Sequence, residues 1–186
     1  MKKLLVAATL AASAGFSSYN LSAAEYTVDP VHTFITFKVQ HLGVSWLQGR
    51  FNDITGSFSY DADNSTTSNV NMTVNTTSVD SNHAERDKHL RSEDFLETDK
   101  FPTASFQSTG FDGTTLKGDL TLHGVTAPIS IAVTKVGEGK DPWGGYRAGF
   151  VGTYNLKRAD FDISYNLGPA AEVVEMEFNI EGIQNK

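Results

Sequence analysis

Cysteine is absent from this chain of 186 residues, and proline (five residues) and tryptophan (two) are sparse. The lack of cysteine excludes disulfides, thiol nucleophiles and thiolate metal sites. If the protein is exported, its core alone must stabilise it. Ordinary apolar content, 39%, argues against a disordered chain. The length predicts one domain, residues 25–186, large enough to bury a sizeable core.

Motifs for common chemistries are also missing. The chain has no His-Glu-x-x-His metal motif, no Gly-x-Ser-x-Gly nucleophile motif and no glycine-rich phosphate loop before a helix. His83 and His89 are six positions apart, so they do not share one face of a helix as a metal pair would. We therefore expect no metal, no cofactor and no enzymatic activity.

The N-terminus has the pattern of a secretory signal peptide. Lys2 and Lys3 precede a short apolar run, and small residues at 22–24 suit cleavage before Glu25. The run is too short to span a membrane, and no later segment is long and apolar enough. The sequence therefore predicts a cleaved signal over residues 1–24 and a periplasmic location.

Basic residues are few in the predicted mature chain. Loss of Lys2 and Lys3 lowers them from 15 to 13 while acidic residues stay at 22, so the net charge moves from −7 to −9. Such a surface repels nucleic acid and anionic lipid headgroups. We expect no nucleic-acid partner.

Alternation of apolar and polar residues fills most of the remaining chain. It predicts about eight strands in sequential hairpins, which suits an up-and-down barrel or a sandwich. We interpret residues 137–145 as a loop between strands. Small residues lie on the predicted inward faces: Gly56, Ala104, Gly118, Ala148 and Gly152. They could leave room for a ligand or relieve crowding where strands curve, and composition does not decide between the two.

Residues 82–102 form the one charge-dense, helix-like stretch after the N-terminus, with a short helical segment expected near residues 82–97. Asn82 and Glu85 have capping-box spacing, and Ser92 begins a second capping pattern. Asp87 and Arg91 have the spacing of a solvated i,i+4 pair. From 81 to 99 three basic residues face six acidic ones, which disfavours a general anion trap. We interpret the stretch as a clasp at one end of the β-structure.

Several motifs together resemble the YceI-like family of exported bacterial proteins. They are the opening Tyr26-Thr-Val-Asp-Pro30, the stretch Gln40-His-Leu-Gly43, the long run from Thr77 to Phe95, the hairpin from Gly118 to Pro128, and the pair Asp141-Pro-Trp-Gly-Gly145 and Asn166-Leu-Gly-Pro-Ala170. The likeness covers the whole predicted mature chain. One departure is Asp162, where many members have glycine, which puts the local turn in doubt.

The resemblance implies an all-β, lipocalin-like, eight-stranded antiparallel barrel. It also implies binding of a long isoprenoid lipid, either a polyprenyl phosphate or an isoprenoid quinone, along the barrel axis. The family has no settled catalytic residues to carry over to this chain. Charge counting favours a neutral quinone head unless Arg86 is presented inward. We also expect transient membrane contact, and Phe34 and Trp46 are candidates for pairing two barrels in a homodimer.

Candidate ligand-binding residues follow from the inward strand positions and the clasp. For the lumen they are Ile35, Phe37, Val39, His41, Phe58, Met72, Val74, Phe106, Leu120, Leu122, Phe150, Tyr154, Met176 and Phe178. For the head group and clasp they are Arg86, His89, Leu90 and Phe95.

Two other functions remain open at this stage. One is an enzyme acting on a lipid or small apolar molecule, with His41 or His89 as base, which needs a polar partner beside the histidine inside a cavity. The other is a stress-response protein whose barrel is filled and takes no ligand. A continuous cavity argues against the second.

Overall fold

The period-two alternation forms strands over most of the chain. The computed structural model describes residues 23–186, so most of the predicted signal peptide lies outside the described residues. Its strands are β1 (Ala24–Val28), β2 (Phe34–His41), β3 (Ser45–Phe51), β4 (Ile54–Tyr60), β5 (Asn69–Asn75), β6 (Val79–Asp80), β7 (Thr103–Phe111), β8 (Thr115–Leu122), β9 (Val125–Lys140), β10 (Tyr146–Lys157) and β11 (Val173–Gln184).

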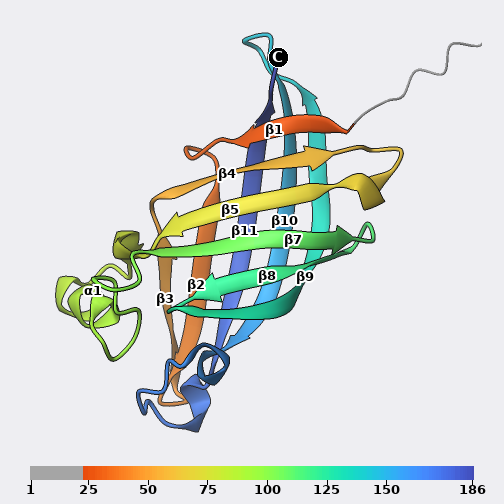
Figure 1. Ribbon diagram of the computed structural model, residues 1–186. Coiled ribbons are helices and arrows are strands. Elements are labelled where there is room, and N and C mark those ends of the chain that lie inside the picture. Colours follow the sequence, from red (N-terminus) through yellow and green to blue (C-terminus); the bar gives the residue numbers. More distant parts are fainter. Residues whose placement is uncertain (1–22) are drawn as a thin grey trace, which may run out of the picture.

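These eleven segments make the eight strands of a closed antiparallel barrel, which confirms the expected fold (Figure 1). β1 and β2 both pair with β11, one after the other along its length, and so count as one barrel strand. In the same way β3 and β4 make a second barrel strand, and β5 and β6 a third. The pairing of β1 with β11 closes the ring. A closed ring leaves no free edge for aggregation at that end of the barrel.

The barrel is flattened into two sheets that cross at a steep angle, as Figure 1 shows. β9 belongs to both, because it pairs with β8 up to Ala132 and with β10 from Ala132 onward. Pro128 lies in the first half, where β9 has β8 as its one paired neighbour, so its missing N–H interrupts no ladder. β9 reaches Lys140, so our assignment of residues 137–145 to a loop was wrong, and the turn is confined to residues 141–145.

The helix α1 spans Ala84–Arg91 and is shorter than predicted. Its N-cap is His83, whose side chain accepts a hydrogen bond from the backbone N–H of Arg86 at 3.3 Å. The predicted cap at Asn82 is therefore wrong, because Asn82 takes a left-handed turn (φ 63°) before the helix begins. Ser92 does not start a second helix either, since its hydroxyl donates to the carbonyl of His89 and ends α1.

The predicted solvated pair on α1 is also wrong. Asp87 is buried and accepts hydrogen bonds from the backbone N–H and the hydroxyl of Ser81. Arg91 donates instead to the carbonyls of Thr77 and Val79. The strand segment before α1 lies alongside the helix and supplies these partners, which local i,i+4 spacing does not reveal. The two side chains thus fasten α1 to the barrel.

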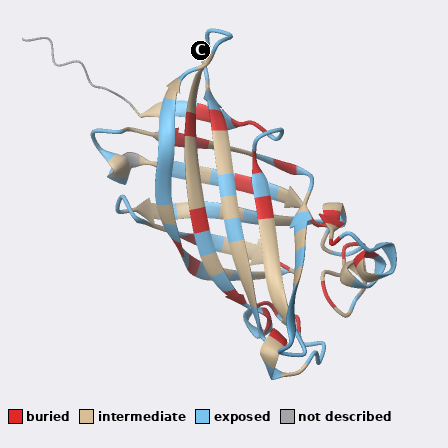
Figure 2. Ribbon diagram, turned by 180° about the vertical axis from the view of Figure 1, so that it is seen from behind, coloured by how far each residue is buried: buried red, intermediate tan, exposed pale blue. Residues whose placement is uncertain are grey.

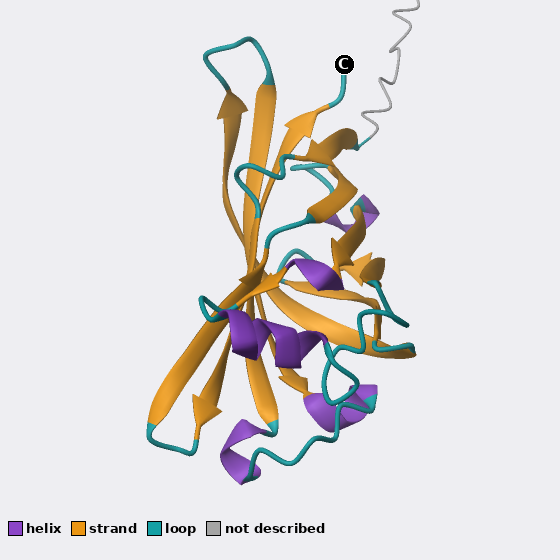
Figure 3. Cartoon of the chain, turned by 90° about the vertical axis from the view of Figure 1, so that its left-hand side faces the viewer, coloured by secondary structure: helices purple, strands orange, loops and turns teal. Residues whose placement is uncertain are grey.

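The helix α1 lies at one side of the barrel in Figure 1 and in front of the strands in Figure 3, which is seen from that side. The short helices Arg158–Phe161 and Pro169–Ala171 lie in the connection between β10 and β11. Along the strands, buried positions recur between exposed ones (Figure 2). Buried side chains form two clusters, one around Tyr26 and Phe58 and one around Phe95, Leu122 and Phe161. The space between these clusters holds the candidate site.

Candidate functional site: an open apolar cavity

A cavity of about 1280 Å³ occupies the barrel interior. Its walls come from β2 to β5, β7 to β11, the α1 region and residues 163–168, and they are predominantly apolar. Small-molecule pockets are typically roughly 300–1,000 Å³. The barrel is therefore not filled, which argues against the filled-barrel alternative, and its interior suits a ligand longer than a common metabolite.

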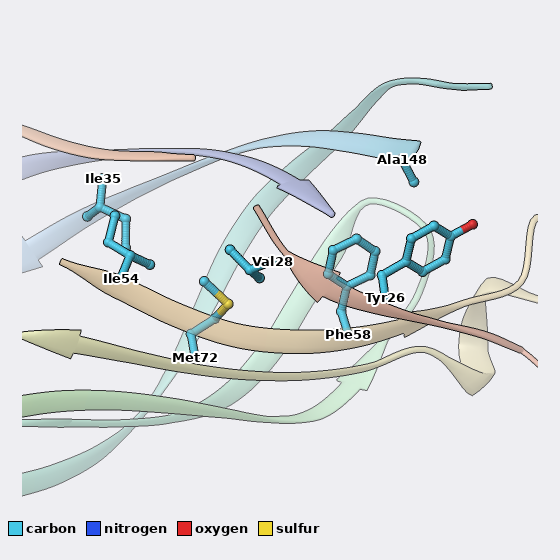
Figure 4. Close-up of a cluster of buried hydrophobic side chains, with 7 residues drawn as sticks. All are labelled: Tyr26, Val28, Ile35, Ile54, Phe58, Met72 and Ala148. Atoms are coloured by element: carbon cyan, nitrogen blue, oxygen red, sulfur yellow. The ribbon is translucent and has the colours of Figure 1, made fainter. Parts of the chain in front are cut away.

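Packed aromatic rings lie at one part of the cavity wall. Tyr26 and Phe58 stack with their ring centroids 4.8 Å apart, and Phe150 meets Phe58 edge-on at 5.6 Å. Figure 4 shows Tyr26 and Phe58 side by side, with Ala148 beyond them. Tyr26 is 2% exposed, and burial raises the pKa of its hydroxyl. These rings form an apolar part of the cavity wall around Phe58 and Phe150.

Gly56 and Gly118 on the inward faces relieve crowding and do not create the empty space. A Cβ at Gly118 would lie 2.4 Å from Cζ of Phe106. A Cβ at Gly56 would lie 2.6 Å from the sulfur of Met72. Each glycine therefore accommodates a large side chain from a neighbouring strand. This decides between the two alternatives that composition left open, at least at these two positions.

The structure brings every predicted site residue to this one cavity. The lining contains Ile35, Phe37, Val39, His41, Phe58, Met72, Val74, Phe106, Leu120, Leu122, Phe150, Tyr154, Met176 and Phe178, together with Arg86, His89, Leu90 and Phe95. Period-two alternation sufficed to place the strand residues, because side chains on one face of a barrel strand share its interior. Their contact with a ligand stays a prediction.

The clasp is held to the barrel mouth by three rings. His89 lies 4.9 Å from Phe95 and 5.2 Å from Tyr165, and Phe95 lies 5.2 Å from Tyr165, between ring centroids. Tyr165 comes from the loop between β10 and β11, so the contact joins two distant parts of the chain. Phe95 is 8% exposed. The sequence indicated Phe95 and His89 but not Tyr165, which lies outside any alternating strand.

Arg86 faces the cavity and has no carboxylate partner. Its Nε donates to the hydroxyl of Ser81 at 2.7 Å and its Nη2 to the carbonyl of Ser81. The Ser81 hydroxyl in turn donates to Asp87. Within residues 23–186 no ion pair forms at Arg86 itself. The serine therefore positions the guanidinium at the cavity wall and leaves its charge without a direct partner there.

A second arginine at the wall, Arg158, was missed by sequence reasoning. It is 9% exposed and donates to the carbonyls of Ala171, Ile163 and Tyr165 at 2.7, 3.3 and 3.0 Å. Burial lowers its pKa, yet guanidinium stays protonated in proteins, and no ion pair neutralises it within the described residues. No periodicity signals such a residue, because its acceptors come from a loop that only the fold brings near.

The turn around Arg158 keeps its shape despite the aspartate that replaces glycine there. Asp162 adopts the left-handed conformation (φ 55°), which aspartate tolerates better than most residues. Its N–H bonds to the carbonyl of Ala159 at 3.3 Å. The departure from the family pattern therefore leaves this turn in place.

A polar cluster around Arg147 lies outside the cavity lining. Arg147 donates to Asp29 and Glu181 at 2.6 Å each and to Asp141 at 3.0 Å, and His32 lies 2.8 Å from Asp29. The hydrogen bond from Arg147 lowers the pKa of Asp29 to about 2. Candidate ligand atoms of Asp29, His32 and Glu181 lie within 4.8 Å of one another. The guanidinium already neutralises two of these groups, so the cluster joins β1, β10 and β11 as an ion-pair network.

The histidines offered as catalytic bases have different surroundings. His89 Nε2 lies 2.8 Å from Asp94 Oδ2, but both side chains are more than 40% exposed. The ring of His89 is packed edge-on against two aromatic rings. These contacts explain the position of His89 by its packing in the clasp. His41 lines the cavity wall as well.

Within residues 23–186, every helix is too short or too polar to cross a membrane. The model of the YceI-like domain family matches residues 26–182. A UPF0312 protein of Shewanella baltica is 53% identical over 191 residues, covering 99% of this chain and all of that protein. A UPF0312 protein of Ectopseudomonas mendocina is 56% identical over 169 residues, covering 87% of this chain and 88% of that protein.

Solved structures with the same fold include three bacterial proteins. BcnA of Burkholderia cenocepacia has a TM-score of 0.72 at 19% identity and covers 83% of this chain and 98% of its own. The YceI protein of Campylobacter jejuni has a TM-score of 0.70 at 24% identity, covering 80% and 91%. A polyisoprenoid-binding domain from Saccharophagus degradans has a TM-score of 0.65 at 16% identity, covering 88% and 100%. With the family match over residues 26–182, the chain belongs to the YceI-like family.

Proposed function

We propose that this protein binds a long isoprenoid lipid in its barrel cavity and carries it in the periplasm. The observation that supports this most is the predominantly apolar cavity of about 1280 Å³ inside the barrel. Burial of each tail methylene contributes about 0.8 kcal/mol. A tail that fills the cavity would therefore bind tightly without any polar contact.

Two features beyond the cavity support an isoprenoid in particular. The solved domain from Saccharophagus degradans with the same fold is described as polyisoprenoid-binding. The inner wall is long and lined by branched and aromatic side chains, which pack against methyl-branched chains by dispersion contacts. The N-terminal signal pattern supports export to the periplasm, and a carrier has a use there because free prenyl lipids are insoluble.

Arg86 and Arg158 support an anionic head group, as in a polyprenyl phosphate. Both line the cavity, and both have hydrogen-bond partners that carry no charge. A phosphate reaching them would gain charge-assisted hydrogen bonds, which are about twice as strong as neutral ones. The net negative charge of the chain favours a neutral quinone head only if Arg86 does not face inward. Arg86 lines the cavity, so that condition is not met. We therefore rank the polyprenyl phosphate ahead of the quinone.

Lipid extraction tests the proposal directly. The native protein, purified without detergent, is extracted with organic solvent and analysed by mass spectrometry, and the lipid-free protein is titrated with an undecaprenyl phosphate and with an isoprenoid quinone. A co-purifying prenyl lipid, or saturable binding of either one, is expected. No prenyl lipid in the extract together with no binding on titration would refute the proposal.

A blocked-cavity variant makes the test specific to the interior. Ala104 points into the cavity, and Ala104→Phe fills part of it at a cost of about 1–3 kcal/mol in stability. Binding should fall in this variant while its circular dichroism spectrum stays that of the wild type. Equal binding by both proteins would place the lipid outside the barrel.

A further inference from the structure

Two segments beside the clasp form what we call the rim of the cavity opening: residues 39–49 at the β2–β3 turn and residues 163–171 before β11. Neither contains Asp, Glu, Lys or Arg, although these residues make up 20% of the chain. Large apolar side chains project from the rim into solvent: Leu42 is 72% exposed, Val44 81%, Trp46 46%, Tyr165 40% and Leu167 36%. Exposed apolar groups clustered in this way mark interaction surfaces.

The two segments form one continuous surface around the opening. A Cβ at Gly43 would lie 3.9 Å from the Cβ of Ala170, so the β2–β3 turn touches the short helix Pro169–Ala171. Leu42, Trp46 and Leu167 both line the cavity and reach solvent. Any molecule that enters or leaves the cavity at this end passes between these exposed side chains.

The opposite end of the barrel provides an internal comparison. Its β9–β10 hairpin also exposes apolar side chains, Val136 at 69% and Trp143 at 80%. That hairpin carries charges, however, and Arg147 lies over the ring of Trp143 at 5.7 Å while it binds Asp141. Both ends of the barrel thus expose apolar side chains. Of these two surfaces, the rim is the one that contains no Asp, Glu, Lys or Arg.

We propose that the rim docks on the surface of a lipid bilayer and presents the cavity opening to it. The expected net charge of −9 disfavours approach to anionic surfaces, and an uncharged rim can enter a zwitterionic interface without desolvating an ion. Trp and Tyr favour the level of lipid headgroups. At the border of the rim, Lys38 is paired with Glu175 at 2.9 Å and lies over the ring of Trp46 at 4.8 Å.

Docking here extends the proposed lipid-carrier function and gives it a route. A prenyl tail leaving the bilayer could pass between Leu42 and Leu167 into the cavity without crossing water. The docking itself does not depend on which lipid the cavity holds, so it can be tested with vesicles that contain no isoprenoid.

The test uses the full protein with Trp143→Phe, which leaves Trp46 as the one tryptophan. Binding to vesicles of phosphatidylcholine and phosphatidylethanolamine is measured by co-sedimentation and by the emission maximum of Trp46. Binding with a blue shift is expected. Val44→Glu should weaken it about tenfold or more. The control Val136→Glu, at a valine of the other end that is also largely exposed, should leave it unchanged.

Uptake of a polyprenyl phosphate from detergent micelles separates docking from lipid binding, since Val44 does not line the cavity. Val44→Glu should slow uptake from vesicles and leave uptake from micelles unchanged. Docking is refuted if the wild type takes up lipid from micelles but does not sediment with vesicles, or if both valine variants lose vesicle binding equally. It is also refuted if the wild type forms a dimer that Val44→Glu dissociates and no vesicle binding occurs, because the rim then pairs two copies of the chain.

Discussion

Truncation of Phe95 to alanine should loosen the clasp at the cavity opening. Phe95 is 8% exposed and contacts the rings of His89 and Tyr165 at 4.9 and 5.2 Å. Removal of a buried phenylalanine costs roughly 3–5 kcal/mol. One side of the Phe95 ring borders the cavity and has no side chains packed against it. We therefore expect Phe95→Ala to lower the free energy of unfolding by about 2–3 kcal/mol. For a chain of this length that corresponds to a fall in Tm of about 4–12 °C.

The same substitution should speed release of the bound lipid. With Phe95 gone, the α1 region loses its ring contact to the loop that carries Tyr165, so the mouth can open with less loss of packing. Dissociation is followed by stopped-flow fluorescence after mixing loaded protein with excess vesicles. Leu90→Ala, at a cavity-lining position on α1, should increase the rate further when combined with Phe95→Ala.

Phe34→Ala is the matched control, because Phe34 is 43% exposed and absent from the cavity lining. It should change stability by less than about 0.5 kcal/mol and leave the release rate as it is. If Phe95→Ala has a wild-type Tm and a wild-type release rate, the clasp interpretation is wrong. If it lowers Tm without changing the release rate, Phe95 stabilises the fold but does not frame the opening.

Three more outcomes are expected. Arg86→Gln should weaken binding of a polyprenyl phosphate about tenfold, as loss of a charge-assisted hydrogen bond would, and change quinone binding little; equal losses in paired titrations would contradict the head-group assignment. The pKa of Asp29 is lowered to about 2 by Arg147, so its stabilisation of about 2 kcal/mol is present above pH 4 and disappears as the pH falls from about 4 to 2. Urea titrations of Asp29→Asn should therefore show lower stability at pH 7 and a flatter acid limb, and an acid limb like that of the wild type would be inconsistent with this. Gly118→Ala places a Cβ 2.4 Å from Phe106 and should cost about 1–3 kcal/mol in the same assay; unchanged stability would mean that the ring moves freely.

Local patterns predicted the strands, and together with the barrel that the family resemblance implied they placed most of its lining. Strand side chains alternate between two faces, so the inward set can be read from the sequence once a closed barrel is assumed. That is why the predicted inward residues, of which Ile35 is the first and Phe178 the last, all line the same cavity. The hairpin turn at His123-Gly124 was also predictable, and both residues adopt positive φ there, 52° and 77°.

The details of α1 were not predictable because tertiary partners replaced local ones. The i,i+4 spacing of Asp87 and Arg91 fits an exposed pair. In the structure, however, Asp87 accepts from Ser81, and Arg91 donates to two backbone carbonyls of the neighbouring segment. A buried carboxylate that accepts two hydrogen bonds is satisfied without a cation. Similarly, Asn82 leaves the cap to His83 because the chain must turn away from β6 first.

The sequence by itself determined which side chains line the interior, because period-two alternation is a property of the backbone. It also determined the acidic charge and the absence of thiol chemistry. Only the tertiary structure decided that the interior is open, since the inward glycines accommodate side chains such as Phe106 and the space lies elsewhere. It alone brought Tyr165 to Phe95, Arg158 to the cavity wall and the two uncharged segments to one rim. These contacts join residues far apart in the chain, and no local pattern encodes them.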